Sequence, residues 1–584
     1  MLDMRLLKNF VLLTIVAVLL IGCNTDNEVY ITGKPKIVLD SESGVYTVKE
    51  GAELTISPDF QHCTDNTSIV WTMDGKVVCT DVEWTSVWPE IGTFYATIEA
   101  RNDAGSTTEE ICIEVVELTP PIISLPLASD RVTVKVGTNY EIVPQVQHSD
   151  MDGFSMSWYL GGKKVAEGTT YTFCQSEIGT YQLKIVAENS DGSVERTVEI
   201  EVVSEYPYSA YFLPVSRLQE STTRYTFVGR PVCLRSHTEY FVAPTYQWLI
   251  DGEETECSDE MLVFTPQKPG TYRVEVSVSE NESVVSTEVE VVCVEETEEG
   301  RRRYASADNS MYSNKVYEYL PAPGQFINET QTGGMTGAET TMEAAVAWAE
   351  KRINEHKIVS LGAFGGYIVV GFDHSVSSGS GEYDFAIESN AFEGSNEPGV
   401  VWVMQDVNGN GKPDDEWYQL RGSEYDEPST RQNYAVTYFR PSGARMAVQW
   451  IDSEGNYGTI DYCPDFHIQD FYYPLWIEAQ AYTLYGTCLA ARNSIDQSTG
   501  NWVNAPYAWG YADNKGSDNL GGDSTGSGQS IGFKISNAVM ANGKPAELRY
   551  IDFVKVQTGV QAKSGALGEL STEVLGFRDL SMNE

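Results

Sequence analysis

Apolar and polar residues alternate in short runs along the first half of this 584-residue chain. Residues 93–99, 181–187 and 271–278 read T-F-Y-A-T-I-E, Y-Q-L-K-I-V-A and T-Y-R-V-E-V-S-V. A period of two places one face of each run in a core and the other in water, so we expect β-strands. Turn sequences such as D-G and N-D-A-G separate the runs by roughly 8 to 12 residues, as in small antiparallel sandwiches.

One pattern occurs three times before residue 300. Trp71, Trp158 and Trp248 each precede a glycine by four residues, and the first glycine of a G-T-aromatic step by 21, 21 and 22 residues. A register held this closely indicates three copies of one domain, in which the tryptophan packs between two sheets. We predict the copies at residues 30–117, 118–203 and 204–295.

The W-x-x-D/G-G, G-T-Y and A-x-N-x-x-G elements of these copies resemble the immunoglobulin-like PKD domains of bacterial surface proteins. The last element is clear at residues 100–105 and 187–192, but the third copy lacks it. The resemblance implies spacers that hold another domain away from a membrane. Binding of glycans or proteins by these domains is the alternative.

Beyond a linker at residues 296–314, residues 315–584 form a single unrepeated block. We predict the helix of this block at residues 340–355, where Thr341 can cap the first turn. The apolar residues that lie on one stripe of this helix are Met342, Val346, Ala349 and Ile353. The runs that we predict as strands are 367–372, 383–388, 400–404, 435–439, 547–557 and 568–574. This block is expected to be a jelly-roll-like β-sandwich with one helix, and the whole chain to be mainly β.

The N-terminus predicts export and a lipid anchor. Residues 1–22 are typical of a signal peptide, with Arg5 and Lys8 before an apolar run. The sequence L-I-G-C, which ends at Cys23, resembles the lipobox of bacterial lipoproteins and implies that Cys23 is lipidated. The following N-T-D-N-E resembles the surface-export signal of Bacteroidetes lipoproteins. We therefore expect the outer face of the outer membrane; an ordinary secreted protein is the alternative.

The formal net charge of −45 argues against nucleic acid and anionic lipid as partners, because phosphate binding needs clusters of lysine and arginine. One such cluster, at residues 301–303, lies in the linker. No H-E-x-x-H or C-x-x-C sequence is present, and no Ser/His/Asp grouping stands out. We therefore predict a protein that is not an enzyme, although a carboxylate pair for glycoside hydrolysis stays open.

The sharpest chemical motif is D-V-N-G-N-G-K-P-D-D-E-W at residues 406–417. It matches an EF-hand calcium loop, with oxygen-bearing side chains at alternate positions and Gly411 where the chain turns sharply. Trp417 stands in place of the usual final glutamate, so an earlier carboxylate would have to complete the site. The predicted ligands of a structural calcium ion are Asp406, Asn408, Asn410, Lys412 through its carbonyl, Asp414 and Asp415. A hairpin turn without an ion is the alternative.

Aromatic residues are dense in two loop-like segments, F-Y-Y-P-L-W at 471–476 and N-W-V-N-A-P-Y-A-W-G-Y-A-D-N at 501–514. Rings among asparagine, aspartate and glycine suit a large, flat, partly polar ligand. The predicted ligand-binding residues are Trp502, Tyr507, Trp509, Tyr511, Asp513, Tyr473 and Trp476. For Tyr473 and Trp476 a position in the core is equally expected.

Segments 365–376, 383–403, 406–425, 508–514 and 550–560 together resemble the C-terminal domain of BtuH-type Bacteroidetes surface lipoproteins. The resemblance implies binding of cobalamin (vitamin B12) and its delivery to a TonB-dependent outer-membrane transporter. His467 could approach the cobalt, although a lone histidine is more often a hydrogen-bonded structural residue. A glycan-binding or adhesive module is the alternative function.

Overall fold

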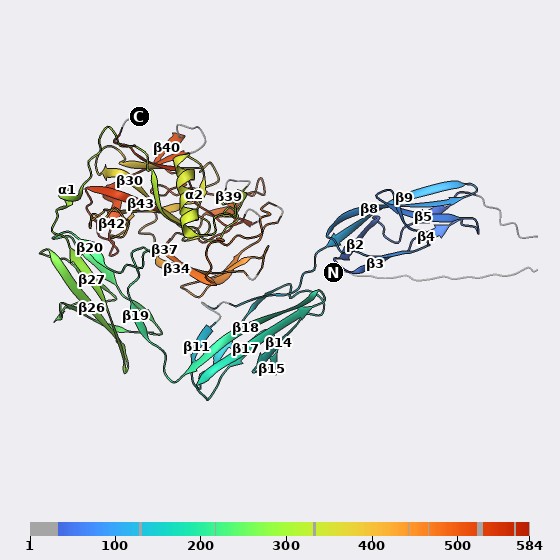
Figure 1. Cartoon of the computed structure of the whole chain (residues 1–584), viewed down its shortest axis with the longest axis horizontal. Coiled ribbons are helices and arrows are strands. Elements are labelled where there is room, and N and C mark those ends of the chain that lie inside the picture. Colours follow the sequence, from blue (N-terminus) through green and yellow to red (C-terminus); the bar gives the residue numbers. More distant parts are fainter. Residues whose placement is uncertain are drawn as a thin grey trace, which may run out of the picture. The chain divides into compact units, whose positions relative to one another are not determined.

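The computed structural model describes residues 33–125, 127, 131–216, 218–330, 334–441, 443–464, 466–522, 529–565 and 568–582 (Figure 1). The predicted signal peptide and the predicted lipidation site, Cys23, lie outside these residues. The chain divides into two compact units. The first extends to Pro121 and includes residues 151–153 and 188–193, and the second contains the remaining residues.

The three repeats fold into sandwiches with the same strand order, and each contains one five-stranded sheet. In the first domain this sheet consists of β2 (Val45–Lys49), β9 (Gly105–Val116), β8 (Gly92–Asn102), β5 (Ser68–Met73) and β6 (Lys76–Cys79). The strands opposite it are β1 (Lys36–Val38) with β4 (Asp59–Gln61), and β3 (Glu53–Ile56) with β7 (Trp84–Val87). Strand β2 runs parallel to β9, whereas the other pairs are antiparallel.

The second and third domains repeat this arrangement. The second sheet consists of β11 (Arg131–Lys135), β18 (Gly192–Val203), β17 (Gly179–Asn189), β14 (Ser155–Leu160) and β15 (Lys163–Glu167), and its facing pairs are β10 (Ile122–Ser124) with β13 (Gln145–Gln147) and β12 (Tyr140–Ile142) with β16 (Tyr171–Phe173). The third consists of β20 (Arg224–Thr226), β27 (Ser283–Cys293), β26 (Gly270–Glu280), β23 (Thr245–Ile250) and β24 (Glu253–Glu254), faced by β19 (Ser209–Tyr211) with β22 (His237–Glu239) and β21 (Val232–Arg235) with β25 (Met261–Phe264). The predicted mainly β, immunoglobulin-like fold is thus confirmed for all three copies.

The repeated tryptophans fill the three cores as predicted. Trp71, Trp158 and Trp248 are each 0% exposed. Each indole N–H donates to a backbone carbonyl 10, 10 or 11 residues further on, over 2.9, 2.7 and 2.8 Å. The hydrogen bond removes the cost of burying the indole nitrogen, so the large ring stabilises each sandwich.

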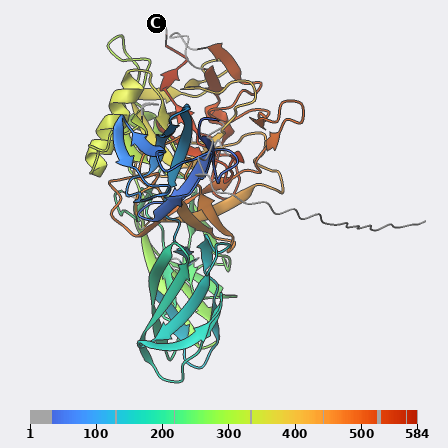
Figure 2. The same ribbon diagram turned by 90° about the vertical axis from the view of Figure 1, so that its right-hand side faces the viewer.

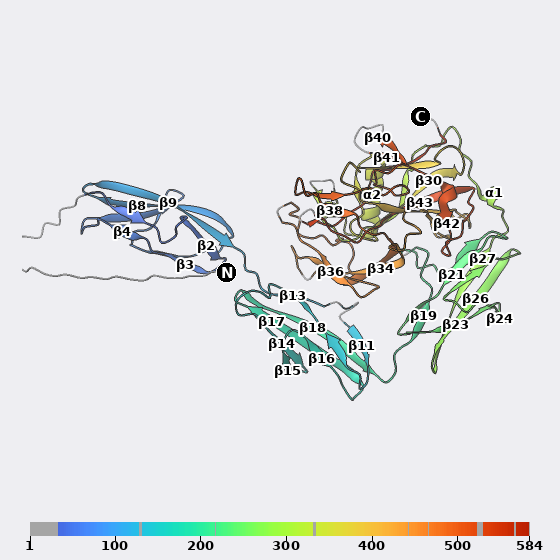
Figure 3. The same cartoon turned by 180° about the vertical axis from the view of Figure 1, so that it is seen from behind.

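The C-terminal domain is a larger β-sandwich with a helix, built from three sheets (Figures 1 and 3). The central sheet consists of β28 (Lys315–Leu320), β30 (Tyr367–Ser377), β43 (Tyr550–Thr558), β32 (Gly399–Met404), β33 (Tyr418–Leu420) and β42 (Ala538–Val539). One outer sheet consists of β40 (Asn519–Gly522), β41 (Gln529–Phe533), β31 (Phe385–Ser389) and β45 (Gly576–Asp579). The other consists of β36 (Tyr457–Ile460), β35 (Val448–Asp452), β34 (Arg431–Phe439) and β37 (Ala481–Cys488). Smaller elements are the pairs β29 (Val359–Ser360) with β44 (Glu573–Val574) and β38 (Asn493–Ile495) with β39 (Trp502–Asn504), and the short helix η2 (Ile535–Asn537).

Strand β30 shows why the central sheet lies inside the domain. Ile368, Val370 and Phe372 point into one hydrophobic core, with the outer sheet of β31 and the helix. Tyr367 and Val369 point into a second core, which includes residues of β34, β35 and β37. Because alternate side chains face opposite sides of a strand, a run that is apolar at every position is buried on both faces.

The predicted helix is α2 (Met342–Asn354), the yellow helix in Figure 2. The hydroxyl of Thr341 accepts from the amide N–H of Ala344 over 3.2 Å and so caps the first turn, as predicted. The side chains buried on its inner face are Ala345, Ala349 and Ile353. Within the described residues, none of the helices is long and apolar enough to cross a membrane.

The predicted strand at residues 568–574 is mostly wrong, because only Glu573–Val574 (β44) forms a strand. The residues before it form one isolated bridge, between Lys563 and Glu569, and side chains also hold this segment. Glu569 accepts from the amide N–H of Gln325 over 2.8 Å, and Ser571 accepts from that of Gly362 over 3.0 Å. Polar side chains thus add to the few backbone hydrogen bonds of this segment.

The linker after the third domain packs against its neighbours. It forms the short helix α1 (Glu298–Arg301), whose Glu298 pairs with Arg230 of the third domain at 2.9 Å. Glu298 also accepts from Gln405 of the C-terminal domain over 2.9 Å, and Arg303 pairs with buried Asp552 at 2.9 Å. These contacts hold the third immunoglobulin-like domain against the C-terminal domain within the second unit.

Candidate functional site

A row of side chains crosses five strands of the central sheet and forms the floor of a cleft. The strand register aligns Glu318 of β28 with Val369 of β30, Val369 with Lys555 of β43, Lys555 with Trp402 of β32, and Trp402 with Gln419 of β33. Residues opposite one another in a sheet project to the same face. Their neighbours on each strand, such as Val401 and Val403, belong to the core on the other face and leave this row free to line a cleft.

The third immunoglobulin-like domain supplies one wall of this cleft. Two hollows of about 220 and 280 Å³ meet there, and both are lined by Leu213 and Pro214 of the third domain and by Trp417 and Tyr485 of the C-terminal domain. Ligand pockets usually have volumes of about 300–1,000 Å³, so each hollow alone is smaller than this range. The two together can hold part of a large ligand or most of a small one.

Lys555 lies in an aromatic box at the centre of the floor. Its ammonium nitrogen lies 4.9 Å from the ring centres of Trp402 and Trp417 and 5.8 Å from that of Tyr367. Burial lowers the pKa of Lys555 to about 8, while the charge of Glu318 acts in the opposite direction. Burial in turn raises the pKa of Glu318, whose carboxylate accepts from the Tyr367 hydroxyl over 2.9 Å. The cleft therefore combines broad apolar rings with a buried acid and a buried base.

Polar groups in the cleft are available to a ligand. The indole N–H of Trp402 is buried and has no hydrogen-bond partner among the described residues. Such a group costs about 1–3 kcal/mol when it stays unpaired, and a bound acceptor would remove this cost. Gln432 and Asn433 also line the cleft and are exposed. The site thus offers exposed amides at its rim, and the indole N–H of Trp402 at its floor is buried without a partner in the described part of the chain.

The predicted calcium loop has donors of the right kind. Gly411 turns the chain with φ of 73°, and its N–H donates to Asp406 over 3.0 Å. One carboxylate oxygen of Asp406 and one of Asp415 are buried without a partner among the described residues. Burial raises the pKa of both groups, and Asp406 and Asp414 raise that of Asp415 further. Carboxylate oxygens that are buried without a partner are ligands of the kind that a hard cation takes.

Other groups of the same loop pair with one another. The side-chain amides of Asn408 and Asn410 donate to Asp414 over 2.8 and 2.9 Å. Lys412 donates its N–H to the Asn410 side chain over 2.8 Å. Calcium in this loop therefore stays a prediction. The loop ends at Trp417, the residue that departs from the EF-hand pattern, and this ring lines the cleft.

The structure does not gather the predicted aromatic residues at one surface. Two of the predicted ligand-binding residues, Tyr507 and Tyr511, do not lie at the surface. They are 2% and 1% exposed and pack at 5.5 Å in a small core. Tyr473 is also buried, and Trp476 packs against the two main cores. Only Trp509, at 37%, is an exposed large side chain among them, and Trp502 is half-buried in β39. The turn-forming residues around these rings mark loops that fold back over the sandwich.

Contacts with neighbouring side chains hold His467 in place, as is usual for a structural histidine. Its Nδ1 lies 2.7 Å from a carboxylate oxygen of Glu329, and its ring contacts Phe326 edge to face at 5.0 Å. The ring is therefore already oriented by protein groups.

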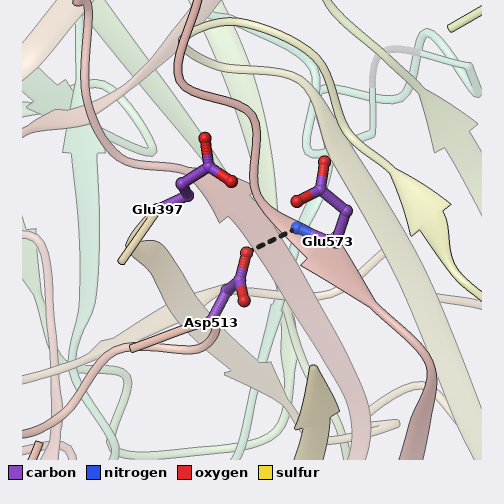
Figure 4. A group of neighbouring side chains, drawn as sticks. All are labelled: Glu397, Asp513 and Glu573. Carbon is purple, nitrogen blue, oxygen red and sulfur yellow. Dashed lines mark hydrogen bonds between the residues drawn. The ribbon is translucent and has the colours of Figure 1, made fainter. Parts of the chain in front are cut away.

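Asp513 belongs to a buried acidic group that the sequence did not indicate (Figure 4). Glu397, Asp513 and Glu573 each offer a carboxylate oxygen, and these three atoms lie within 4.8 Å of one another. Within the described parts of the chain this is the one group of three such side chains placed so closely. The triad could hold a metal ion. No spacing rule would have found it, because its members are more than 50 residues apart.

Comparison with known proteins supports the assignment of the first two repeats as PKD-like domains. Residues 34–102 and 120–189 match the family model of the PKD-like domain. No curated protein matches the chain. Similar solved structures include the I-band fragment I67–I69 of titin, with 15% identity over 45% of this chain and 99% of that one and a TM-score of 0.20. The immunoglobulin domains 1–5 of Sidekick-1 are 14% identical over 45% of this chain and 59% of that one, with a TM-score of 0.22. Fibronectin(III)-like modules of Clostridium thermocellum CbhA are 14% identical over 29% of this chain and 94% of that one, with a TM-score of 0.18. The chain therefore contains two PKD-like domains within a mainly β, multi-domain protein.

Proposed function

We propose that this protein binds a corrinoid, such as cobalamin, in the cleft between the third immunoglobulin-like domain and the C-terminal domain. The observation that carries the proposal is the cross-strand row of the floor, in which Trp402 keeps an unpaired indole N–H beside the aromatic box of Lys555. Large rings beside a few polar groups are a feature of ligand-binding sites.

The chemistry of the cleft matches that of a corrinoid. The ligand is flat and carries amides around its edge, so the rings of Trp417 and Tyr485 offer apolar contact while Gln432 and Asn433 offer amide hydrogen bonds. The volumes of the two hollows allow one edge of the macrocycle to enter, and the rest would face solvent. A partly exposed ligand suits a protein that passes it to a transporter.

Calcium in the loop would support this site. The loop from Asp406 to Asp415 precedes Glu416 and Trp417 directly, and Glu416 lies 3.7 Å from Arg224 of the third domain. An ion that fixes the loop would therefore also fix the Trp417 wall and the contact with the third domain. We propose that calcium is structural here and takes no part in chemistry.

A glycan is the second candidate ligand, and two observations favour it. Each hollow is closer in size to one or two sugar rings than to a macrocycle. In addition, the ammonium group of Lys555 could pair with the carboxylate of an acidic sugar. Tryptophan rings and side-chain amides suit sugars as well as corrinoids.

Calorimetric titration of the full chain with cyanocobalamin, beside a glycan array, separates the two ligands. We expect heat of binding with cyanocobalamin and a loss of at least about tenfold in affinity for Trp417→Ala, which is roughly 1.4 kcal/mol. Trp509→Ala is the matched control, because this exposed ring lies in the same domain and does not line the cleft. Binding of acidic glycans without binding of cyanocobalamin would favour the second candidate.

We further propose that the protein is a lipoprotein at the outer face of the outer membrane, in which the immunoglobulin-like domains are spacers and a TonB-dependent transporter receives the ligand. The L-I-G-C sequence supports the anchor, and the lack of a recognisable catalytic grouping supports a role without catalysis. Labelling of cells with a fatty-acid analogue tests the anchor. Wild type should be labelled and Cys23→Ser should not; labelling of both would exclude Cys23 as the acylated residue.

A further inference from the structure

The acidic triad is assembled by the backbone of three separate segments. The carbonyl of Asp513 accepts from the N–H of Glu397 over 3.0 Å, and its carboxylate accepts from the N–H of Glu573 over 2.9 Å (Figure 4). Asp513 itself has φ of 51°, in the left-handed region that is unfavourable for most residues. The fold therefore holds these carboxylates together at a cost in backbone conformation.

The triad has no opposite charge to balance it. No lysine or arginine forms an ion pair with any of the three carboxylates among the described residues. Asp513 and Glu573 are 1% and 4% exposed. Burial raises the pKa of all three groups, and repulsion from neighbouring carboxylates raises those of Glu397 and Asp513 further. A group of buried like charges must either take up protons or bind a cation.

Unpaired oxygen atoms around the triad point to a cation. One carboxylate oxygen of Asp513 is buried without a partner among the described residues, and so are the hydroxyl oxygen of Ser389 and the amide oxygen of Asn390. Ser389 is fully buried beside Asp513, and the Asn390 side chain lies beside Glu573. A cation bound here could take all of these oxygen atoms as ligands.

A cavity of about 310 Å³ adjoins this group. Glu397, Glu573, Asn390 and Ser360 line its polar side, and Phe326 and Phe392 line its apolar side. Ser360 already donates to Glu573 over 3.0 Å and so orients this carboxylate. The cavity provides room for an ion and for the water molecules that complete its coordination.

We propose that Glu397, Asp513 and Glu573, with oxygens of Asn390 and Ser389, bind a divalent hard cation, and that this cation is calcium. Every candidate donor is an oxygen, which favours calcium over zinc or copper. The site is separate from the loop at Asp406, and none of its three acids lines the cleft. It therefore does not depend on the proposed corrinoid function.

Calcium binding by the full chain tests this site. Protein stripped with a chelator is titrated with calcium by calorimetry, using the double variant Asp406→Asn/Asp414→Asn to silence the loop. We expect this variant to bind one calcium ion per chain, and the same variant with Asp513→Asn to bind none. The proposal is overturned if the loop-silenced protein binds no calcium up to about 1 mM, the weak end for extracellular calcium modules.

Thermal unfolding of Glu397→Gln gives a second test that does not depend on binding heats. In a chelator this isosteric variant should be at least as stable as wild type, because one acid of a repelling group becomes neutral. Calcium should raise the melting temperature of the loop-silenced protein but not that of the loop-silenced protein with Glu397→Gln. Equal calcium effects on both would show that the triad only shares protons.

Discussion

Replacement of Lys555 by methionine should stabilise the protein near neutral pH, because the charged lysine is buried at a cost. The fall of its pKa from 10.5 to about 8 corresponds to about 3 kcal/mol of unfavourable free energy for the charged form. Cation–π contacts with the rings of Trp402, Trp417 and Tyr367 stabilise the charged form and offset about 1 kcal/mol of this cost. Methionine has a similar length and no charge, so we expect the Lys555→Met variant to be more stable by about 2 kcal/mol at pH 7.

The sign of the pH dependence makes this prediction specific. The pKa of Lys555 is lower in the folded state than in the unfolded state, so the cost is fully present below about pH 8. Wild type becomes relatively more stable as the pH rises from about 8 to 10.5, because its folded state loses the proton first. The advantage of Lys555→Met should therefore shrink over this range.

Urea denaturation of the two proteins at pH 7 and near pH 10 measures this difference. The chain has several domains and unfolds in more than one step, so only the transition that differs between the proteins is compared. Lys563→Met is the matched control, since this lysine is 49% exposed and pairs with Asp461 at the surface, and it should change stability by less than about 1 kcal/mol. A Lys555→Met protein that is less stable than wild type at pH 7 would refute the reasoning.

Three further changes test the fold. Trp158→Ala should destabilise the second domain by about 3–5 kcal/mol, because the ring is fully buried. Calorimetry should show a lower melting temperature for one transition and unchanged melting temperatures for the others. Thr341→Ala should cost about 1 kcal/mol through loss of the helix cap, whereas Thr341→Ser should retain most of the stability in the same assay. Burial lowers the pKa of His374, but hydrogen bonds to Asp579 and Asp373 outweigh it and the net pKa is raised. His374→Asn should therefore be destabilised most below about pH 6.5, and the difference from wild type, measured by urea denaturation, should fall as the pH rises through the pKa of the folded state; a constant difference would contradict this ion pairing.

Local patterns in the sequence predict most of the fold. The period-two runs mark long strands such as β8, β17 and β26, and the regular tryptophans mark the three cores. The cap residue and apolar stripe locate α2 almost to its ends. These features depend on neighbours in the chain, so the sequence displays them directly.

The candidate sites depend on pairing between distant strands, which the sequence does not display. Lys555 and Gln557 alternate with Val554 and Val556 in β43, and this alternation does indicate one polar face. The register that aligns Lys555 with Trp402 and Val369 is not visible in any single segment. Density of aromatic residues was a poor guide for the same reason, because the loop that contains Tyr507 and Tyr511 folds inward.

Nuclear magnetic resonance of tryptophan indole groups tests the location of the ligand most directly. The chain has 12 tryptophans, and single substitutions assign the signals of the indole N–H groups. Addition of cyanocobalamin should shift the signals of Trp402 and Trp417 and leave that of Trp509 unchanged. Shifts of Trp509 and Trp502 without any change at Trp402 would contradict binding in the cleft.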